Sequence, residues 1–225
     1  MNTIYIPATS ADQWAQFLAE PVKQWRTGYS ARTLAYSWQE AEGFPSEVRE
    51  ALSASEPFVG IKLLLALPEH QVPLPGGSRP SQNDIWVLAR AGTGLVSIAV
   101  EGKVAEPFGP TLAEWLDGGS AGKTARLAFL RNELGLPETV PGSVRYQLLH
   151  RTASAIIEAK RFGASHAVML VHSFSQSHLW FEDYSAFAAL LGAKVEINRI
   201  TSVGQRGGVH LHLGWVCGNE KYLSK

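Results

Sequence analysis

Two stretches in which apolar residues recur at every second position, residues 84–90 and 95–103, flank the sequence Ala91-Gly-Thr-Gly. Such alternation on both sides of a glycine-containing turn predicts a β-hairpin, because successive side chains of a strand point to opposite faces. Glycine at the first central position suits a type II′ turn, and a four-residue loop gives the same register. The predicted register places apolar pairs on one face: Ile85 with Val100, Val87 with Ile98, and Ala89 with Val96.

The other face of the hairpin bears three charged residues. Asp84 falls directly opposite Glu101, and Lys103 lies two residues beyond Glu101 on the same face. Like charges opposite each other on a sheet cost roughly 0.2–1 kcal/mol, and a divalent cation between them reverses the sign of that interaction. Carboxylate oxygens are the ligands that Mg²⁺ and Mn²⁺ prefer. The sequence therefore predicts a metal site at Asp84 and Glu101, with Lys103 placed to position or deprotonate a water molecule.

The same three residues also fit a hairpin without a metal. In that interpretation Asp84 is a turn residue before a strand, and Glu101 and Lys103 are ordinary polar residues where the next strand leaves the core. An acid followed two positions later by lysine is common by chance, whereas such a pair with a second acid opposite it in register is rarer, and both interpretations stay open. A shift of one residue would turn Asp84 to the opposite face and remove the site.

Helices and strands are also expected around the hairpin. Before it, the patterns predict a strand at Thr3–Ile6, helices within residues 10–41, a helix at Ser46–Ala54 and a central strand at Phe58–Leu67. After it, they predict a helix at Ser143–Phe162, a strand at Ala167–His172, a helix at Tyr184–Gly192 and a strand at Val209–Val216. This series indicates one α/β or α+β domain with a helical front end.

The composition is that of an ordinary globular protein, with 45% hydrophobic residues in 225. This length favours one domain, residues 1–225. The single cysteine, Cys217, excludes an internal disulfide. The start lacks a signal-peptide pattern and no apolar stretch is long enough to span a membrane, so we expect a cytoplasmic protein with no membrane partner. Twenty basic residues balance twenty acidic ones, which gives no support to a large nucleic-acid footprint.

Three segments resemble a known group of enzymes. They are Val100-Glu-Gly-Lys-Val-Ala-Glu-Pro-Phe-Gly-Pro, Tyr146-Gln-Leu-Leu-His-Arg-Thr-Ala-Ser-Ala and Val171-His-Ser-Phe. With the order of the expected elements from Ser46 to Phe174, they resemble the PD-(D/E)XK nuclease superfamily, in particular a little-characterised bacterial family related to it. The resemblance implies a restriction-endonuclease-like core, α-β-β-β-α-β with a mixed sheet, over residues 46–174. Residues 1–45 would form a helical N-terminal extension, and residues 175–225 would add a helix and a strand.

The resemblance also implies roles for the hairpin residues. In this superfamily the acid before the second strand and the acid of the E-x-K motif bind metal, and the lysine serves catalysis. Those roles fall on Asp84, Glu101 and Lys103, with Mg²⁺ or Mn²⁺ as the cofactor. The proline of the motif is displaced, because Pro80 lies four residues before Asp84 rather than next to it.

Members of the superfamily often use further polar residues. A glutamate from the first helix is common, for which Glu40, Glu42 or Glu47 could serve. The helix after the hairpin often contributes a substrate-binding residue, for which Gln147 and Arg151 fit. The implied activity is hydrolysis of phosphodiester bonds in DNA, with RNA as the second choice. The oligomeric state stays open.

Two other functions also fit the sequence. The neutral charge and the displaced Pro80 favour a catalytically inactive nuclease fold that binds nucleic acid or a protein partner. A zinc-dependent hydrolase would use His210 and His212, which share a face of the last strand, with His172 or Cys217 as a third ligand.

Two segments show weaker patterns. Residues 117–124 differ by one residue from a phosphate-binding P-loop, with Asp117 where the first glycine belongs. Thr111-Leu-Ala-Glu-Trp-Leu before them predicts a helical turn instead of the required strand, so we interpret them as a linker that caps a helix near Thr124–Glu133. Arg199 and Arg206, with the glycines that follow, predict a basic flexible loop that either meets phosphate or is simply solvated.

Overall fold

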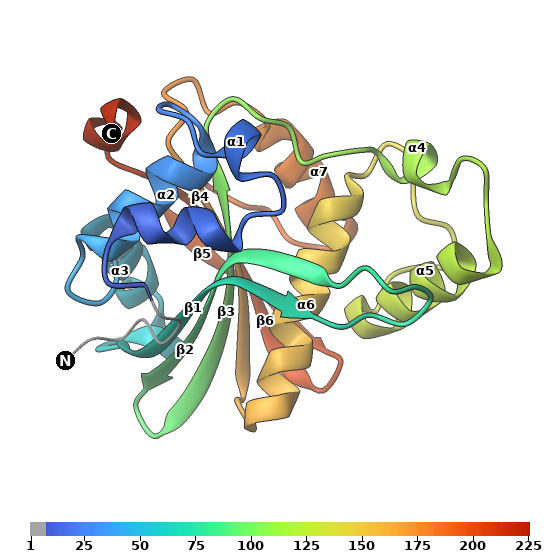
Figure 1. Ribbon diagram of the computed structural model, residues 1–225. Coiled ribbons are helices and arrows are strands. Elements are labelled where there is room, and N and C mark those ends of the chain that lie inside the picture. The colour runs from blue at the N-terminus through green and yellow to red at the C-terminus, as the bar shows by residue number, and fades with distance from the viewer. Residues whose placement is uncertain (1–7) are drawn as a thin grey trace.

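The strands assemble into one sheet in a computed structural model that describes residues 8–225 (Figure 1). The strand order is β1-β2-β3-β4-β6-β5. The sheet is mixed, because β3, β4 and β6 are parallel while the other neighbours are antiparallel. The expected α+β class is therefore confirmed, and the strand expected at residues 3–6 lies outside the described residues. The strands are β1 (Lys62–Val72), β2 (Ser81–Ala91), β3 (Gly94–Lys103), β4 (His166–Ser173), β5 (Arg199–Arg206) and β6 (Val209–Cys217).

Strands β2 and β3 form the predicted hairpin in the predicted register. The pairs are Ile85 with Val100, Val87 with Ile98, and Ala89 with Val96. In the two-residue turn, Gly92 has a φ of +56° while Thr93 has no positive φ, as a type II′ turn requires. Asp84 and Glu101 are the next residues of the two strands beyond the pair of Ile85 with Val100. The register on which the site prediction depends is thus present.

The strand predicted at Phe58–Leu67 is displaced along the chain and lies elsewhere in the sheet. Phe58 ends a short helix, η2 (Glu56–Phe58), and Gly60 adopts a φ of +68° before β1 begins at Lys62. We predicted a central strand, but β1 is an edge strand, and Leu64 on it is 36% exposed. The apolar run indicated burial on both faces, but it could not reveal that no other strand of residues 8–225 pairs with one edge of β1.

The predicted basic loop around Arg199 and Arg206 is instead a strand. These residues begin and end β5, which pairs with β6 through a turn at Gly207 and Gly208. Its residues are all exposed or half-buried, so the strand lacks the apolar alternation by which strands are recognised. The helix predicted at residues 184–192 corresponds to α7 (Phe181–Leu190), and the strand predicted at residues 209–216 corresponds to β6.

Helices cover both faces of the sheet (Figure 1). On one side α6 (Tyr146–Phe162) lies against the strands and is flanked by α5 (Ala121–Leu134) and α7, around a core that includes Leu149, Met169 and Trp215. On the other side η1 (Ala11–Phe17), α2 (Ser30–Gln39) and α3 (Ser46–Ser53) pack around Leu34 and Trp38. The predicted N-terminal extension therefore contributes directly to the core. The remaining short helices are α1 (Pro21–Gln24), α4 (Leu112–Leu116) and η3 (Glu220–Ser224).

The segment that resembles a P-loop lies between two helices. It follows α4, which begins with a capping box at Thr111 and Glu114, and not a strand. Ser120 accepts a hydrogen bond from the N–H of Lys123 and so caps α5, as we interpreted it. None of the described helices combines the length and apolar character needed to cross a membrane.

Candidate functional site

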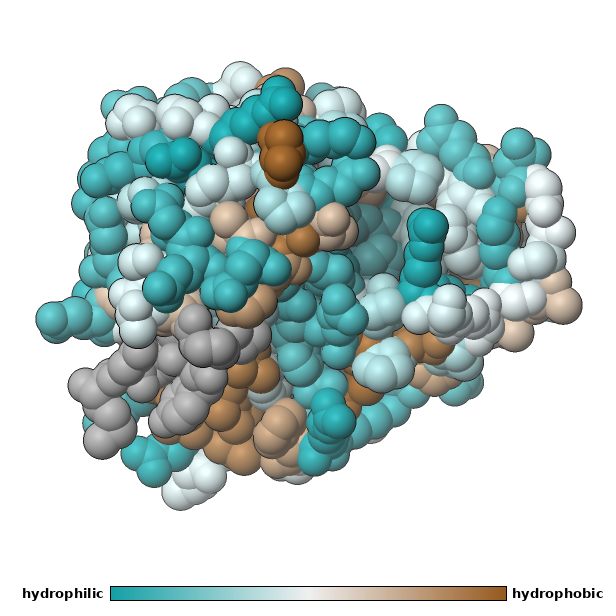
Figure 2. Space-filling model, viewed as in Figure 1, coloured by the Kyte–Doolittle hydropathy of each residue, from teal (hydrophilic) through white to brown (hydrophobic). Residues whose placement is uncertain are grey.

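A cavity of about 410 Å³ lies where the ends of β1, β2 and β3 approach α6. Its polar wall contains the predicted hairpin residues and both predicted helix residues: Asp84, Glu101, Lys103, Gln147 and Arg151, with Glu69 and Gln82 from β1 and β2. The opposite wall comes from residues 18–31, which join η1, α1 and the start of α2. Figure 2 shows hydrophilic residues around the recess between the N-terminal helices and the part formed by α4 and α5.

Glu101 is the centre of the polar wall and is only 2% exposed. Its Oε1 accepts hydrogen bonds from Nζ of Lys103 at 2.7 Å and from Nε2 of Gln147 at 2.8 Å. Its Oε2 accepts one from Nε of Arg151 at 2.6 Å. Burial alone would raise the pKa of Glu101, but attraction to Lys103 and Arg151 outweighs it and lowers this pKa below its ordinary value. Glu101 is therefore a firmly ionised carboxylate.

Lys103 is held in place by two contacts. Its ammonium group bonds to Glu101 and lies 4.9 Å from the centre of the Phe108 ring, within the range of a cation–π contact. The side chain is 5% exposed. It reaches the cavity wall because residues 101 and 103 of β3 point to the same face, as predicted.

Asp84 is less enclosed than Glu101, with a side chain 18% exposed. Its Oδ2 accepts a hydrogen bond from the backbone N–H of Gly102 at 2.8 Å, and its Oδ1 lies 4.0 Å from Nη2 of Arg151. Burial, followed by repulsion from Glu101, raises the pKa of Asp84 to about 7. The negative charge of Asp84 is thus only partly compensated within the described residues.

Glu69 is a third acid of the cavity, which sequence reasoning missed. The pairs on either side of it, Pro68 with Ile85 and His70 with Asn83, place it opposite Asp84 in the register of β1 and β2. It has a φ of +52°, and its Oε2 accepts a hydrogen bond from Nε2 of Gln82 at 2.7 Å. Burial and repulsion from Asp84 raise the pKa of Glu69 well above its usual range.

A local signal for Glu69 was present in the sequence. It is an acid at the end of an apolar run, but placing it beside Asp84 required the register of a third strand. The loop from Pro73 to Pro80 is too long to fix that register from its turn type.

Arg151 bridges the two predicted metal-binding acids. Besides the bond from its Nε to Glu101, its Nη1 donates to Oγ of Ser81 at 3.3 Å. Gln147 lies one helical turn earlier in α6, and its buried Oε1 has no hydrogen-bond partner among the described residues. Both residues predicted for substrate binding therefore line the cavity, and Arg151 is also part of its charge network.

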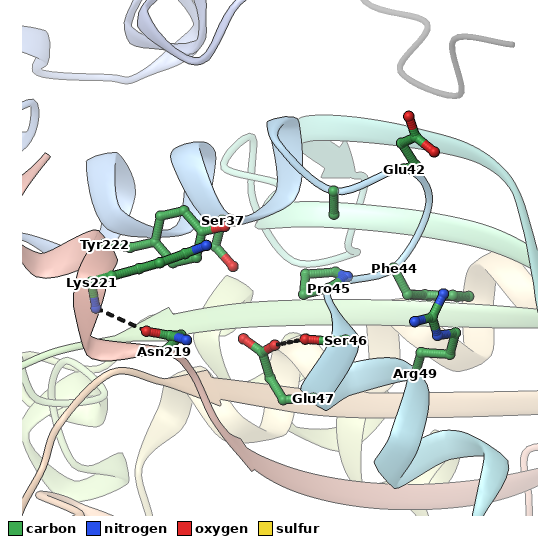
Figure 3. Close-up of a pocket in the computed structure, with 11 residues that line it drawn as sticks. Ser37, Glu42, Phe44, Pro45, Ser46, Glu47, Arg49, Asn219, Lys221 and Tyr222 are labelled. Carbon is green, nitrogen blue, oxygen red and sulfur yellow. Dashed lines mark hydrogen bonds between the residues drawn. The ribbon is translucent and has the colours of Figure 1, made fainter.

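The glutamates suggested as an extra acid do not line this cavity. Glu40 lies 3.4 Å from Nζ of Lys225. Glu42 and Glu47 line a separate cavity of about 300 Å³ between the start of α3 and η3 (Figure 3). In the part of the chain that the structure describes, the further acids that line the candidate site are Glu69 of β1 and Glu106, which follows β3, and not these residues from the helical segment.

Glu47 instead belongs to a buried chain of hydrogen bonds. The indole N–H of Trp38 donates to Nδ1 of His172 at 3.1 Å, which leaves the imidazole proton on Nε2, 3.2 Å from Oε1 of Glu47. Burial lowers the pKa of His172. Burial alone would raise the pKa of Glu47, but its hydrogen bonds, chiefly that with His172, lower it to about 2.

His210 and His212 share a face, but neither proposed third ligand joins them. His172 bonds to Glu47, and Sγ of Cys217 lies 3.6 Å from Nδ1 of His178. Their neighbour is His166 of β4, whose Nδ1 lies 3.1 Å from Nε2 of His212. Across the described residues, no three His, Cys, Asp or Glu side chains are arranged to hold one ion.

The donor set of the cavity nevertheless suits a hard cation, with one restriction. Burial and mutual repulsion make it unfavourable for Glu69, Asp84 and Glu101 all to be ionised at once. A divalent cation bound between them would reduce this repulsion. Mg²⁺ is often bound by only one or two carboxylates, with water and substrate phosphate completing its shell. Asp84 fits such an ion as it stands, and Glu101 fits once one of its three donors moves away.

A comparison with known families places this chain in a group of related sequences. A family model described as a domain of unknown function (DUF6946) matches residues 7–220. The chain belongs to the DUF6946 family. The matched span includes every cavity residue described above, so the cavity is part of the DUF6946 domain itself. No curated protein and no solved structure matches the chain.

Proposed function

We propose that this DUF6946 chain is a metal-dependent nuclease that hydrolyses phosphodiester bonds of DNA, with RNA as the second choice. The observation that supports the proposal is that Asp84, Glu101 and Lys103, from two adjacent strands, line one cavity at a register predicted in advance. The series α3, β1, β2, β3, α6 and β4 also follows the order expected for a PD-(D/E)XK core, with α4 and α5 inserted.

The cavity residues suit in-line attack by water on a phosphodiester. A bound Mg²⁺ or Mn²⁺ would supply charge stabilisation at a phosphoryl oxygen and lower the pKa of a bound water. Lys103 is oriented by Glu101 and Phe108, and its remaining N–H groups can bond a non-bridging oxygen or the attacking water. The buried Oε1 of Gln147, which has no partner among the described residues, can accept a hydrogen bond from that water once the side chain turns towards the cavity.

Two substitutions test this proposal. Lys103→Ala and Asp84→Asn should each lower the rate of Mg²⁺- or Mn²⁺-dependent DNA cleavage by about 100-fold or more, because each removes a group that would touch the reacting atoms. Cleavage of a supercoiled plasmid and of a labelled single-stranded RNA, followed on gels, measures the rate and compares the two substrates.

Matched controls are present in the chain. Nζ of Lys160 lies 2.7 Å from Oε2 of Glu133, and Oδ2 of Asp183 lies 2.7 Å from Nε of Arg145. Both residues thus form ion pairs outside the cavity. Lys160→Ala and Asp183→Asn should leave cleavage within about twofold of the wild-type rate. If Lys103→Ala and Asp84→Asn cleave as well as these controls, the assignment is wrong.

The second candidate is an inactive nuclease fold that binds nucleic acid or a protein partner. The three hydrogen bonds that Lys103, Gln147 and Arg151 donate to Glu101 favour it, because such a network holds the carboxylate without an ion. DNA retention in a gel-shift assay without cleavage, together with calorimetric Mn²⁺ titrations that Glu101→Gln leaves unchanged, would support this candidate over the enzyme.

A further inference from the structure

Glu101 has little capacity left for another ligand. A carboxylate offers about four lone-pair sites, and Glu101 uses three of them for Lys103, Gln147 and Arg151. A metal ion that binds Glu101 must therefore compete with at least one of these donors. The three donors differ in how easily they can leave.

Arg151 is the donor best placed to move. Lys103 lies two residues from Glu101 on the same strand, so local backbone geometry keeps the two side chains together. Gln147 is neutral, so it does not compete with a cation for charge. Arg151 comes from α6 on a long side chain, and its guanidinium reaches towards both Glu101 and Asp84, where a bridging cation would also be attracted.

Arg151 also has groups to offer an incoming anion. Its Nη2 lies 4.0 Å from Oδ1 of Asp84, beyond hydrogen-bond distance, and the residue lines the cavity. Guanidinium groups bind phosphate oxygens through paired N–H donors, and these bonds are stronger than those between neutral groups. A phosphodiester in the cavity therefore competes with Glu101 for Arg151.

We propose that Arg151 is an internal counter-cation that excludes a divalent ion from Glu101 until a phosphodiester draws it away. Metal and substrate then bind cooperatively, since each favours the arrangement that the other requires, and the coupling acts equally in both directions. The inference rests on the proposed function for the identity of the substrate, because it concerns the same cavity.

Mn²⁺ binding to the intact protein, measured by calorimetry and by electron paramagnetic resonance, tests this inference without any cleavage assay. Arg151→Met keeps a long apolar stem and removes the cation. We expect it to bind Mn²⁺ about tenfold more tightly than the wild type in the absence of substrate. Arg145→Met is the matched control, because Arg145 pairs with Asp183 outside the cavity, and it should bind Mn²⁺ as the wild type does.

The coupling is tested by measuring Mn²⁺ affinity in the presence of dimethyl phosphate, the smallest phosphodiester anion. Sodium chloride at the same ionic strength is the control. Dimethyl phosphate should tighten Mn²⁺ binding by the wild type and by Arg145→Met, but not by Arg151→Met. Wild-type affinity that dimethyl phosphate leaves unchanged, or an Arg151→Met protein that binds Mn²⁺ no more tightly than wild type, overturns the inference.

Folding is checked by circular dichroism. If Arg151→Met does not fold, Arg151→Gln removes the charge and keeps an amide that can still donate a hydrogen bond to Glu101. It should bind Mn²⁺ more tightly than wild type, and unchanged binding contradicts the inference. The two proposals fail separately. DNA cleavage with unchanged Mn²⁺ affinity in the Arg151 variants contradicts only the inference, and the predicted affinities without cleavage contradict only the nuclease.

Discussion

Asp84 is subject to opposing influences on its charge. Burial and the neighbouring Glu101 raise its pKa to about 7, whereas Arg151, Lys103 and the N–H of Gly102 favour the ionised form. Since this pKa lies above the ordinary 3.8, the unfolded chain loses its proton first as pH rises. Asp84 therefore lowers the free energy of unfolding progressively between pH 3.8 and about 7, and fully above that.

Asp84→Asn should consequently stabilise the protein when metal is removed. In a chelator at pH 8 we expect its free energy of unfolding to exceed that of wild type by roughly 1–2 kcal/mol, with the difference vanishing near pH 4. Added Mg²⁺ should raise the melting temperature of wild type and not that of the variant. Urea denaturation at both pH values measures the effect, with Asp183→Asn as control. Equal stability of wild type and Asp84→Asn at pH 8 would contradict the account of this pKa.

At the scale of elements, the β2–β3 hairpin depends on its turn. Gly92 has a φ of +56°, and a Cβ added there would meet no atom within 4 Å, so backbone strain is the main cost of a side chain. Gly92→Ala should lower the free energy of unfolding by about 1 kcal/mol. Chemical denaturation checks this value. Thr93→Ala, at the neighbouring turn position, should change stability by less than half as much, and a larger loss there would argue against the turn geometry.

The neighbouring strands β4 and β6 bring three histidines together. His212 is buried against His166, and burial followed by repulsion from His166 lowers the pKa of His212 to about 4. Because this pKa is below the usual 6.5, the unfolded chain takes up a proton first as pH falls. Stability is therefore complete above pH 6.5 and is lost as pH falls towards 4.

We expect His212 to cost up to about 3 kcal/mol of stability at pH 4 relative to pH 7.5. His212→Phe, which fills similar space without a titrating group, should reduce this pH dependence, as measured by guanidinium denaturation at the two pH values. His178→Phe is a suitable comparison, since His178 lies outside the cluster. A pH dependence that His212→Phe leaves unchanged would assign the effect to other groups.

The structural elements that could be predicted from the sequence are those determined by residues close together in the chain. The turn and the alternation around Gly92 were enough to place Asp84, Glu101 and Lys103, because a hairpin register depends on adjacent residues. The edge position of β1, the polar strand β5 and the third acid Glu69 depend on pairing across long loops, which sequence patterns do not specify. Gln147 and Arg151 were placed by resemblance, but the bonds of Arg151 to Glu101 and Ser81 required the structure.

At the scale of the whole molecule, the cavity joins segments from distant parts of the chain. The wall opposite the acids includes Tyr29, Ser30 and Ala31, and the N–H of Ser30 donates to Oε1 of Glu106 at 2.8 Å. The first helices are therefore part of the candidate site as well as of the core. This could not be foreseen from the sequence, which predicted residues 1–45 as an extension outside the nuclease-like part.

The position of Arg151 has a consequence for biosynthesis. Its partner Glu101 lies fifty residues earlier in the chain, and the whole hairpin precedes α6. A chain emerging from the ribosome thus exposes the two strands with their acids well before the helix that brings the opposing cation. The charge network of the mature cavity therefore cannot form until α6 has been made.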